Sequence, residues 1–172
     1  MTDYNKKFIN KNKLAFVIGG SGTIGREVLL ALKSTGCKVV NLDIKFGYKQ
    51  KDIINYYFDC SDTENLEKNF LNATKKFNVP NIFVNCSYPK SIDWKDNSFK
   101  KIKFESYKEN INIHLNSFIW LAKLTADRMV KKKINGSIIQ LSSIYGVNAQ
   151  DRNIYKNTNM QESLTYSVIK GG

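Results

Sequence analysis

The sequence predicts an α/β fold: a doubly wound parallel sheet with helices on both of its faces. Two observations predict it. Short apolar runs alternate along the chain with stretches of helical periodicity. A glycine-rich turn joins the first apolar run, Leu14–Ile18, to the first helical stretch. With 172 residues and 42% hydrophobic residues, the chain can form one domain with a substantial core.

Five apolar runs are predicted to be strands. They lie at residues 14–18, 38–42, 56–58, 81–85 and 137–141. Stretches of helical periodicity separate most of them, which favours parallel pairing in one sheet. A doubly wound sheet usually has about six strands, and the last predicted helix opens only shortly before Gly172. We therefore expect residues 1–172 to form a single domain whose C-terminal strands are missing.

The helices are predicted from capping residues and apolar faces. The first covers residues 26–34, and Gly36 follows it where a left-handed backbone commonly ends a helix. Ser-x-x-Glu boxes predict two further starts, at Ser61 and at Ser106. A last helix is expected near Thr165. The apolar faces of the two middle helices contain Leu66, Phe70, Ala73 and Phe77, and Ile111, Leu115, Phe118, Leu121, Ala122 and Met129.

Charge and cysteine content narrow the functional class. The net charge of +12 comes from 27 basic residues, mostly scattered lysines. This indicates a solvated basic surface rather than a nucleic-acid site. The three cysteines, Cys37, Cys60 and Cys86, lack metal-ligand spacing, so we expect neither a disulfide framework nor a metal site. We find no signal peptide or long apolar span, and we expect a cytoplasmic protein that binds no membrane.

A full G-x-G-x-x-G motif, at Gly20, Gly22 and Gly25, lies between the first strand and the first helix. Backbone N–H groups at a helix N-terminus bind a pyrophosphate, and glycines allow it to approach closely. Asp43 ends the second predicted strand, where a carboxylate accepts hydrogen bonds from ribose hydroxyls and repels a 2′-phosphate. The sequence therefore predicts a site for NAD, with NADP less favoured: no arginine lies nearby, although Lys45 and Lys49 soften that repulsion.

A second group of residues carries acid–base chemistry. Ser142 and Ser143 follow the fifth predicted strand, and Tyr166 and Lys170 stand four residues apart on one face of the last helix. An ammonium group nearby favours the phenolate form of a tyrosine, which then acts as a general acid or base on a carbonyl or an alcohol.

Taken together and in this order, the motifs resemble those of the short-chain dehydrogenase/reductases over essentially the whole chain. The family's glycine fingerprint corresponds to residues 19–25, its Asn-Asn-Ala-Gly motif to residues 85–88, and its Tyr-x-x-x-Lys pair to Tyr166 and Lys170. The resemblance implies a Rossmann fold and an NAD(P)-dependent oxidoreductase. It implies that the catalytic residues are Ser143, Tyr166, Lys170 and His114. The implied cofactor site contains Gly19, Ser21, Gly22, Thr23, Ile24, Gly25, Asp43, Asp59, Cys60, Asn85, Cys86, Ser87, Tyr166 and Lys170.

Departures from the family pattern add further expectations. His114 stands where the family often has a catalytic asparagine; it is either part of a water relay or a packed helix residue, and Asn116 is a weaker substitute. Ser143 and Tyr166 are further apart than usual, so residues 148–161 are expected to overhang the substrate pocket. The motifs around residues 85–89 and 142–147 resemble a branch of flagellin-modification or legionaminic-type sugar biosynthesis oxidoreductases.

In the mechanism that the resemblance implies, Tyr166 exchanges a proton with the substrate oxygen while a hydride moves to or from the nicotinamide. Lys170 supports that tyrosine and holds the nicotinamide ribose, and Ser143 orients the substrate oxygen. The expected substrate is a secondary alcohol or ketone on a small molecule, a sugar or sugar nucleotide. Two alternatives remain: a truncated nucleotide-binding fragment without turnover, and a basic nucleic-acid-binding domain. A full-length version is expected to be a homodimer or homotetramer.

Overall fold

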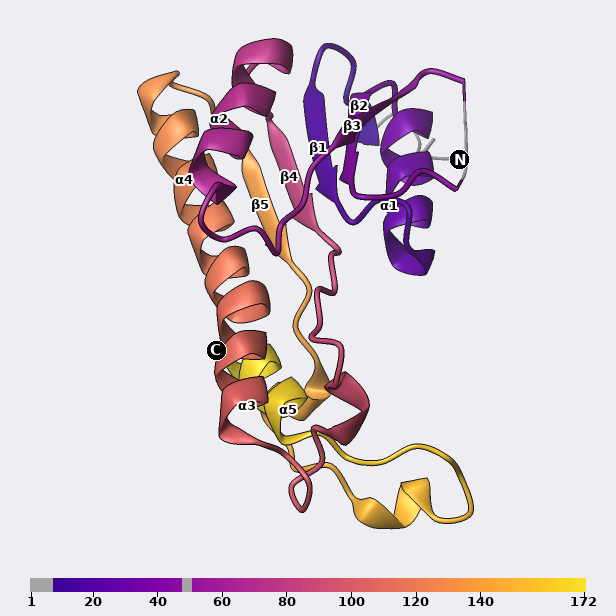
Figure 1. Cartoon of the computed structure of the whole chain (residues 1–172). Helices are drawn as coiled ribbons and strands as arrows, with labels where there is room; N and C mark the ends of the chain where they lie inside the picture. Colours follow the sequence, from indigo (N-terminus) through magenta and orange to yellow (C-terminus); the bar gives the residue numbers. More distant parts are fainter. Residues whose placement is uncertain (1–7, 48–50) are drawn as a thin grey trace, which may run out of the picture.

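The computed structural model describes residues 8–47 and 51–172. Within these residues, five parallel strands form one sheet in the order β3-β2-β1-β4-β5 (Figure 1). The strands are β1 (Leu14–Ile18), β2 (Lys38–Asp43), β3 (Ile53–Tyr57), β4 (Ile82–Asn85) and β5 (Ser137–Gln140). The chain builds outward from β1 on one side and then crosses to β4, so the strand order reverses beside β1. The doubly wound α/β fold predicted from the sequence is thereby confirmed.

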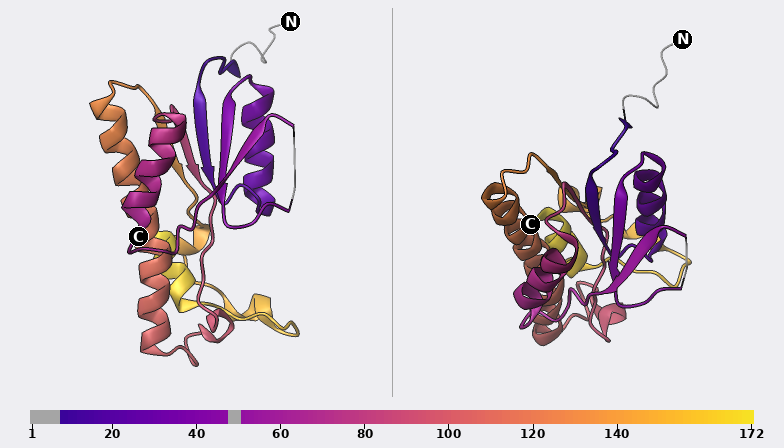
Figure 2. Two further views of the ribbon diagram at one scale, coloured as in Figure 1. Left: turned by 45° about the horizontal axis from the view of Figure 1, so that its top comes forward. Right: turned by 90° about the horizontal axis from the view of Figure 1, so that it is seen from above.

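Helices cover both faces of the sheet (Figure 2). The helix α1 (Thr23–Ser34) covers one face, and α2 (Leu66–Phe77) and α4 (Ser117–Lys131) cover the other. The short helix α3 (Phe104–Asn110) continues into α4 through π-helical turns at Ile111–Asn116, and α5 (Leu164–Gly171) ends the chain. No helix in the described ranges has the length and apolarity needed to span a membrane.

The core lies on both sides of β1, whose five residues are all buried. Phe16 and Ile18 pack towards α2 and α4, while Ala15 and Val17 pack towards α1. The Phe16 ring meets the Phe70 ring of α2 edge to face, with centroids 6.5 Å apart. Burial on both faces explains why this parallel strand is a continuous apolar run rather than an alternating one.

Three predicted helix starts and one strand start are wrong. The helix α1 begins at Thr23, three residues before the predicted start. The Ser61 hydroxyl donates to Asp59 Oδ1 at 2.6 Å instead of capping a helix, and α2 begins only at Leu66. Ser106 lies inside α3, which begins at Phe104, because its hydroxyl is held by Asp93 Oδ1 at 2.8 Å. β3 begins at Ile53, earlier than predicted. The other strands lie where they were expected, and Gly36 has the predicted left-handed backbone, with φ +86°.

Candidate active site

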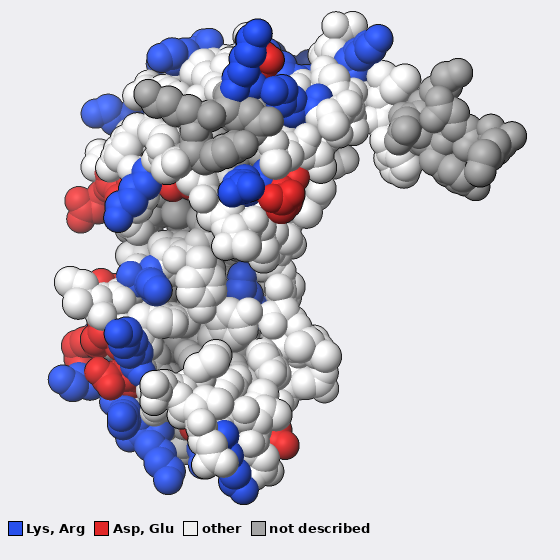
Figure 3. Space-filling model, turned by 90° about the vertical axis from the view of Figure 1, so that its right-hand side faces the viewer, with Lys and Arg blue, Asp and Glu red and all other residues white. Residues whose placement is uncertain are grey.

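A cleft of about 490 Å³ opens at the carboxyl ends of β1, β2 and β4. Figure 3 shows the surface hollowed at mid-height, with basic side chains spread above and below it. The ends of parallel strands beside a reversal in strand order are where ligands bind in this architecture. The cleft lining includes these residues that the sequence predicted for a cofactor: Gly19, Ser21, Gly22, Asp43, Asp59, Cys60, Cys86 and Ser87.

The glycine loop has no room for side chains at its tightest points. Gly19 has a left-handed backbone with φ +71°, and a Cβ there would lie 2.6 Å from Ser87 Cα. A Cβ on Gly25 would collide with the Gly19 carbonyl and lie 2.7 Å from Gly20 Cα. Gly22 is the N-cap of α1. The loop therefore lets a ligand reach the backbone N–H groups at the start of α1, as a pyrophosphate requires.

Asp43 ties the glycine loop to the end of β2. Its Oδ2 accepts a hydrogen bond from Ser21 N at 2.9 Å, and its Oδ1 accepts one from Ile44 N at 2.7 Å. Asp43 also lines the cleft. The sequence predicted that Asp43 contacts the ribose. It did not predict that Asp43 also holds the glycine loop in position.

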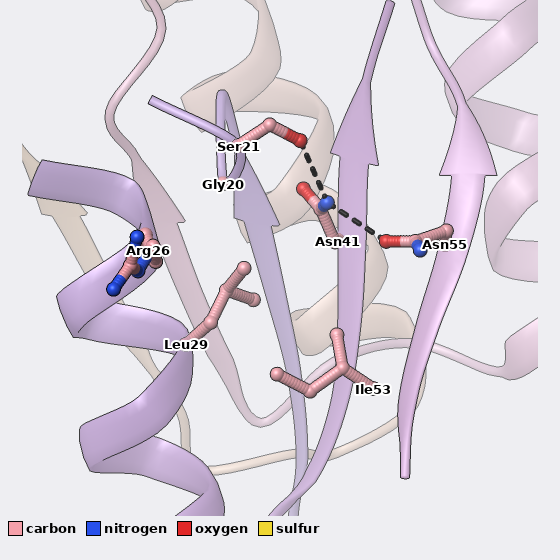
Figure 4. Close-up of a pocket in the computed structure, with 7 residues that line it drawn as sticks. All are labelled: Gly20, Ser21, Arg26, Leu29, Asn41, Ile53 and Asn55. Carbon is pink, nitrogen blue, oxygen red and sulfur yellow. Dashed lines mark hydrogen bonds between the residues drawn. The ribbon is translucent and has the colours of Figure 1, made fainter. Parts of the chain in front are cut away.

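Two hydrogen-bonded amides, the buried Asn41 and the exposed Asn55, lie beneath the same loop (Figure 4). Asn41 Nδ2 donates to Ser21 Oγ at 3.0 Å and to Asn55 Oδ1 at 2.9 Å. Asn41 is only 2% exposed, and its Oδ1 has no hydrogen-bond partner in the described part of the chain. The sequence analysis did not predict these hydrogen bonds. The signal that could have indicated them is a polar residue, Asn41, in the middle of the apolar β2 run.

The other predicted cofactor residues lie outside the cleft lining. Thr23 and Ile24 are exposed on the first turn of α1. Asn85 is fully buried and acts on the cleft through a neighbour, because its Oδ1 accepts hydrogen bonds from Ser87 N at 3.1 Å and from Ser87 Oγ at 2.7 Å. Asp59, which does line the cleft, also holds the turn at Ser61, because its Oδ1 accepts a hydrogen bond from Ser61 N at 2.8 Å.

Lys170 is buried beside the cleft. It is 9% exposed, and its Nζ donates to the Leu141 carbonyl at 2.7 Å. Burial lowers the pKa of Lys170, and the nearby Cys86 thiol acts in the opposite direction. The Lys170 ammonium lies 6.0 Å from the centroid of the Tyr166 ring. The structure thus brings the predicted Tyr–Lys pair together with the cleft residue Cys86.

Ser143 begins the short helical turn η4 (Ile144–Gly146), where its Oγ accepts a hydrogen bond from Tyr145 N at 3.2 Å. The neighbouring Ser142 hydroxyl donates to the Lys170 carbonyl, which joins this turn to α5. No hydrogen bond links Ser143 to Tyr166 within residues 8–47 and 51–172. The ring of Tyr145 forms the connection instead, with its centroid 6.5 Å from that of Tyr166.

His114 is fully buried at the π-helical turns, between the rings of Tyr88 and Phe118 at 5.0 Å and 4.9 Å. Burial, reinforced by the positive charge of Lys170, lowers the pKa of His114 to about 4. The backbone of Pro89 opposes this shift, but no hydrogen bond of ordinary geometry reaches either ring nitrogen from the described residues. His114 is therefore a packed, neutral imidazole with two unpaired nitrogen atoms.

A second cavity, of about 370 Å³, lies over Tyr166. We call it the aromatic pocket. Its lining residues are Tyr88, Trp94, Tyr145, Gln150, Tyr155, Met160, Gln161, Ser163 and Tyr166. Four of them come from the 148–161 segment, so this segment lines a cavity at Tyr166, as expected from the sequence. That the cavity holds the substrate stays a prediction. The sequence did not indicate that the walls would be mainly tyrosine and tryptophan.

A buried polar cluster fixes the start of α5 under this pocket. Asn97 accepts a hydrogen bond from Thr165 Oγ1 at 2.7 Å through its Oδ1, and one from Leu164 N at 3.2 Å through its carbonyl. Its Nδ2 donates to Ser106 Oγ at 2.9 Å, and Ser106 in turn donates to Asp93. These bonds join the loop before α3 to the turn that precedes Tyr166.

Sequence comparison identifies the family. The sequence profile of the short chain dehydrogenase family matches residues 13–156. The chain belongs to this family. Short chain dehydrogenases are an oxidoreductase enzyme family. In an alignment 174 positions long, the chain is 33% identical to the post-translational flagellin modification protein A of Campylobacter coli, covering 94% of this chain and 67% of that protein. It is 28% identical to the acetoacetyl-CoA reductase of Allochromatium vinosum, over 80% of this chain and 59% of the reductase.

Solved structures of short chain dehydrogenases have the same fold. A short chain dehydrogenase from Leptospira borgpetersenii with bound NAD+ superimposes with a TM-score of 0.81 at 24% identity, covering 100% of this chain and 65% of that one. A 4-hydroxyisoleucine dehydrogenase complexed with NADH gives a TM-score of 0.75 at 20% identity, covering 93% and 64%. The chain thus spans about two thirds of the length of these relatives.

Proposed function

We propose that this chain binds a nicotinamide dinucleotide in the cleft and interconverts a secondary alcohol and a ketone in the aromatic pocket. One observation carries the proposal: the helix α5 serves both cavities. Tyr166 lines the aromatic pocket, while the charge of Lys170 acts on Cys86 in the cleft lining. A hydride donor in the cleft and an oxygen beside Tyr166 would then meet along one helix.

The cleft fits the cofactor for steric and polar reasons. The backbone at Gly19, Gly22 and Gly25 leaves space that a Cβ would fill, and the adjoining Asp43 and Asp59 are hydrogen-bond acceptors for hydroxyl groups. We propose NAD over NADP because the Asp43 carboxylate would repel a 2′-phosphate. The NAD+ and NADH of the two structural relatives support a nicotinamide cofactor.

The proposed chemistry divides the reaction between the cofactor and three side chains. When bound, the nicotinamide accepts a hydride from the alcohol carbon or gives one to the carbonyl carbon. In ketone reduction the Tyr166 hydroxyl gives its proton to the substrate oxygen, and in alcohol oxidation the Tyr166 phenolate takes the proton of the alcohol. Lys170 supplies the buried positive charge beside that ring. The Ser143 hydroxyl accepts from Tyr145 N, so its own proton is available to the substrate oxygen.

We further propose that the substrate is a sugar or sugar nucleotide. The similarity to a flagellin modification protein supports this, and the aromatic pocket offers both flat rings and amide groups. His114 lies behind Tyr88 and stays neutral above a pH of about 4. Its unpaired nitrogen atoms could therefore hold a water molecule that relays protons.

Two measurements on this chain test the proposal. Calorimetric titration should show NADH binding, weaker binding of NADPH, and unchanged NADH binding in Tyr166→Phe. Oxidation of secondary alcohols should fall about a thousand-fold in Tyr166→Phe. Turnover that survives this substitution would remove Tyr166 from its role. NADH binding without any turnover would instead support the second candidate, a nucleotide-binding chain, which the two-thirds coverage of its relatives keeps open.

A further inference from the structure

The aromatic pocket is lined entirely by uncharged residues. Its rings can stack against the C–H faces of a ring, and its hydroxyl and amide groups can pair with hydroxyls. An anionic group placed there would lose its hydration without meeting an opposite charge. The nearest buried cation, Lys170, is directed at the Leu141 carbonyl. Arg152 is engaged with Glu162 at 3.0 Å.

We call residues 148–163 the wall of this pocket. The side chain of Gln150 joins the two ends of this segment by hydrogen bonds. Gln150 Oε1 accepts hydrogen bonds from Tyr155 Oη and from Ser163 N, both at 3.1 Å. Gln150 Nε2 donates to the Ser163 carbonyl at 3.2 Å and to Ser167 Oγ at 3.0 Å. Both the oxygen and the nitrogen of this amide thus have hydrogen-bond partners. Through these bonds Gln150, near the start of the wall, is joined to Ser163 at its end and to Ser167, the residue after Tyr166.

Further contacts hold the wall against the rest of the pocket. The pair Arg152 and Glu162 spans the wall from one side to the other. Gln161 donates to the carbonyl of Lys95, next to Trp94. Tyr155 lies close to Tyr145, and loss of solvent together with that neighbour raises the pKa of Tyr155. Its hydroxyl therefore stays protonated and can donate at neutral pH.

We propose that the wall formed by residues 148–163 determines specificity: Tyr155 and Trp94 bind an uncharged, hydroxylated ring of the substrate, and Gln150 positions Tyr155. The proposal rests on the proposed function, because it names what lies beside Tyr166. Any anionic part of a substrate would lie outside the aromatic pocket, in the cleft or in solvent. Gln150 also lines the pocket, but both ends of its amide are already hydrogen-bonded within the chain, so we assign it the role of a positioning residue for Tyr155.

The chain offers a reporter that needs no turnover. It has two tryptophans, Trp94 in the pocket and Trp120 on α4. In a Trp120→Phe variant, the remaining fluorescence reports on Trp94 alone. Methyl β-glucoside and methyl β-glucuronide form a matched pair of probes, because they differ by a carboxylate on the same ring. We expect the glucoside to change the Trp94 emission and the glucuronide to bind at least tenfold more weakly.

Substitutions then test the wall itself. Gln150→Leu, similar in size but unable to bond, should weaken glucoside binding at least tenfold and speed tryptic cleavage after Lys156. Tyr155→Phe removes only the hydroxyl and should weaken binding severalfold while the fold is kept. Asn72→Ala, at an exposed position of α2 outside the wall, is the control and should change neither readout. Circular dichroism checks that each variant is folded.

The outcomes separate this inference from the proposed function. Equal or tighter binding of the glucuronide, or no binding of the glucoside, overturns the inference. Unchanged glucoside affinity in both Gln150→Leu and Tyr155→Phe removes the wall from specificity. If the glucoside pattern holds while NADH fails to bind, the pocket assignment stands and the proposed function fails.

Discussion

The cofactor cleft and the aromatic pocket are built in different ways. The cleft consists of backbone and short side chains at the ends of adjacent strands, and glycines keep it open. The aromatic pocket consists of large side chains from segments far apart in the sequence, including Tyr88, Tyr145 and Tyr166. The cleft therefore depends on steric room, whereas the aromatic pocket depends on the hydrogen bonds and packing of the buried polar groups around it.

The two sites therefore differ in what a substitution disturbs. At the cleft, an added methyl group meets backbone that cannot move aside. Behind the pocket, the buried His114 and Lys170 next to Tyr88 have their pKa values lowered by loss of solvent. Substitutions that add bulk at the cleft should have the same effect at all pH values. The effects of substitutions around the pocket should depend on pH or on the hydrogen-bond partners that are lost.

The largest effect is expected at the glycine loop. Gly19→Ala puts a Cβ 2.6 Å from Ser87 Cα on a left-handed backbone. It should cost about 4 kcal/mol of unfolding free energy and weaken NADH binding more than a hundredfold. Urea unfolding and calorimetry measure both. Gly47→Ala is the control, because a Cβ at Gly47 meets nothing within 4 Å. Equal behaviour of the two variants would show that the loop is not sterically limited.

His114 should make the pocket acid-sensitive. Its pKa is about 4 in the folded chain, against an ordinary value of 6.5 for histidine. The unfolded chain therefore binds a proton first as the pH falls. Stability should be lost between pH 6.5 and 4, by about 3 kcal/mol from this residue. Urea unfolding at several pH values measures it. In His114→Phe that part of the pH dependence should vanish; an identical slope would contradict the assignment.

The buried polar cluster offers a smaller test on the pocket side. Thr165→Val leaves Asn97 Oδ1 without its partner at 2.7 Å and should cost about 2 kcal/mol. Thermal unfolding measures the loss. Thr125→Val is the matched control: Thr125 is equally buried, but its hydroxyl bonds only to the Leu121 carbonyl of its own helix. A control that costs as much as Thr165→Val would show that the link to α5 adds nothing.

The smallest effect is expected at Asp43. Asp43→Asn removes the charge that accepts from Ser21 N and Ile44 N and should cost about 1 kcal/mol. It should also raise the affinity for NADPH relative to NADH about tenfold. Asp127→Asn, on the α4 surface, is the control for loss of a negative charge. An unchanged NADPH to NADH ratio would remove Asp43 from cofactor choice.

Local patterns were enough to predict most of the fold. The apolar runs at β1 and β4 and the left-handed Gly36 were identified correctly because strand burial and backbone conformation are read from neighbouring residues. The capping boxes at Ser61 and Ser106 gave wrong helix starts, because each serine hydroxyl donates to an aspartate that is not part of the capping motif. Asp59 and Asp93 take those hydroxyls, and both partners come from tertiary or turn contacts.

The candidate sites show the same division. The sequence by itself determined the glycine turn, Asp43, and the pairing of Tyr166 with Lys170 on one helix, because these follow from spacing along a strand, a turn or a helix. Only the tertiary structure decided that His114 packs between Tyr88 and Phe118. The same is true of the hydrogen bonds by which Gln150 holds the wall of the aromatic pocket together. Such contacts depend on how separate segments pack, and no spacing within a single segment records them.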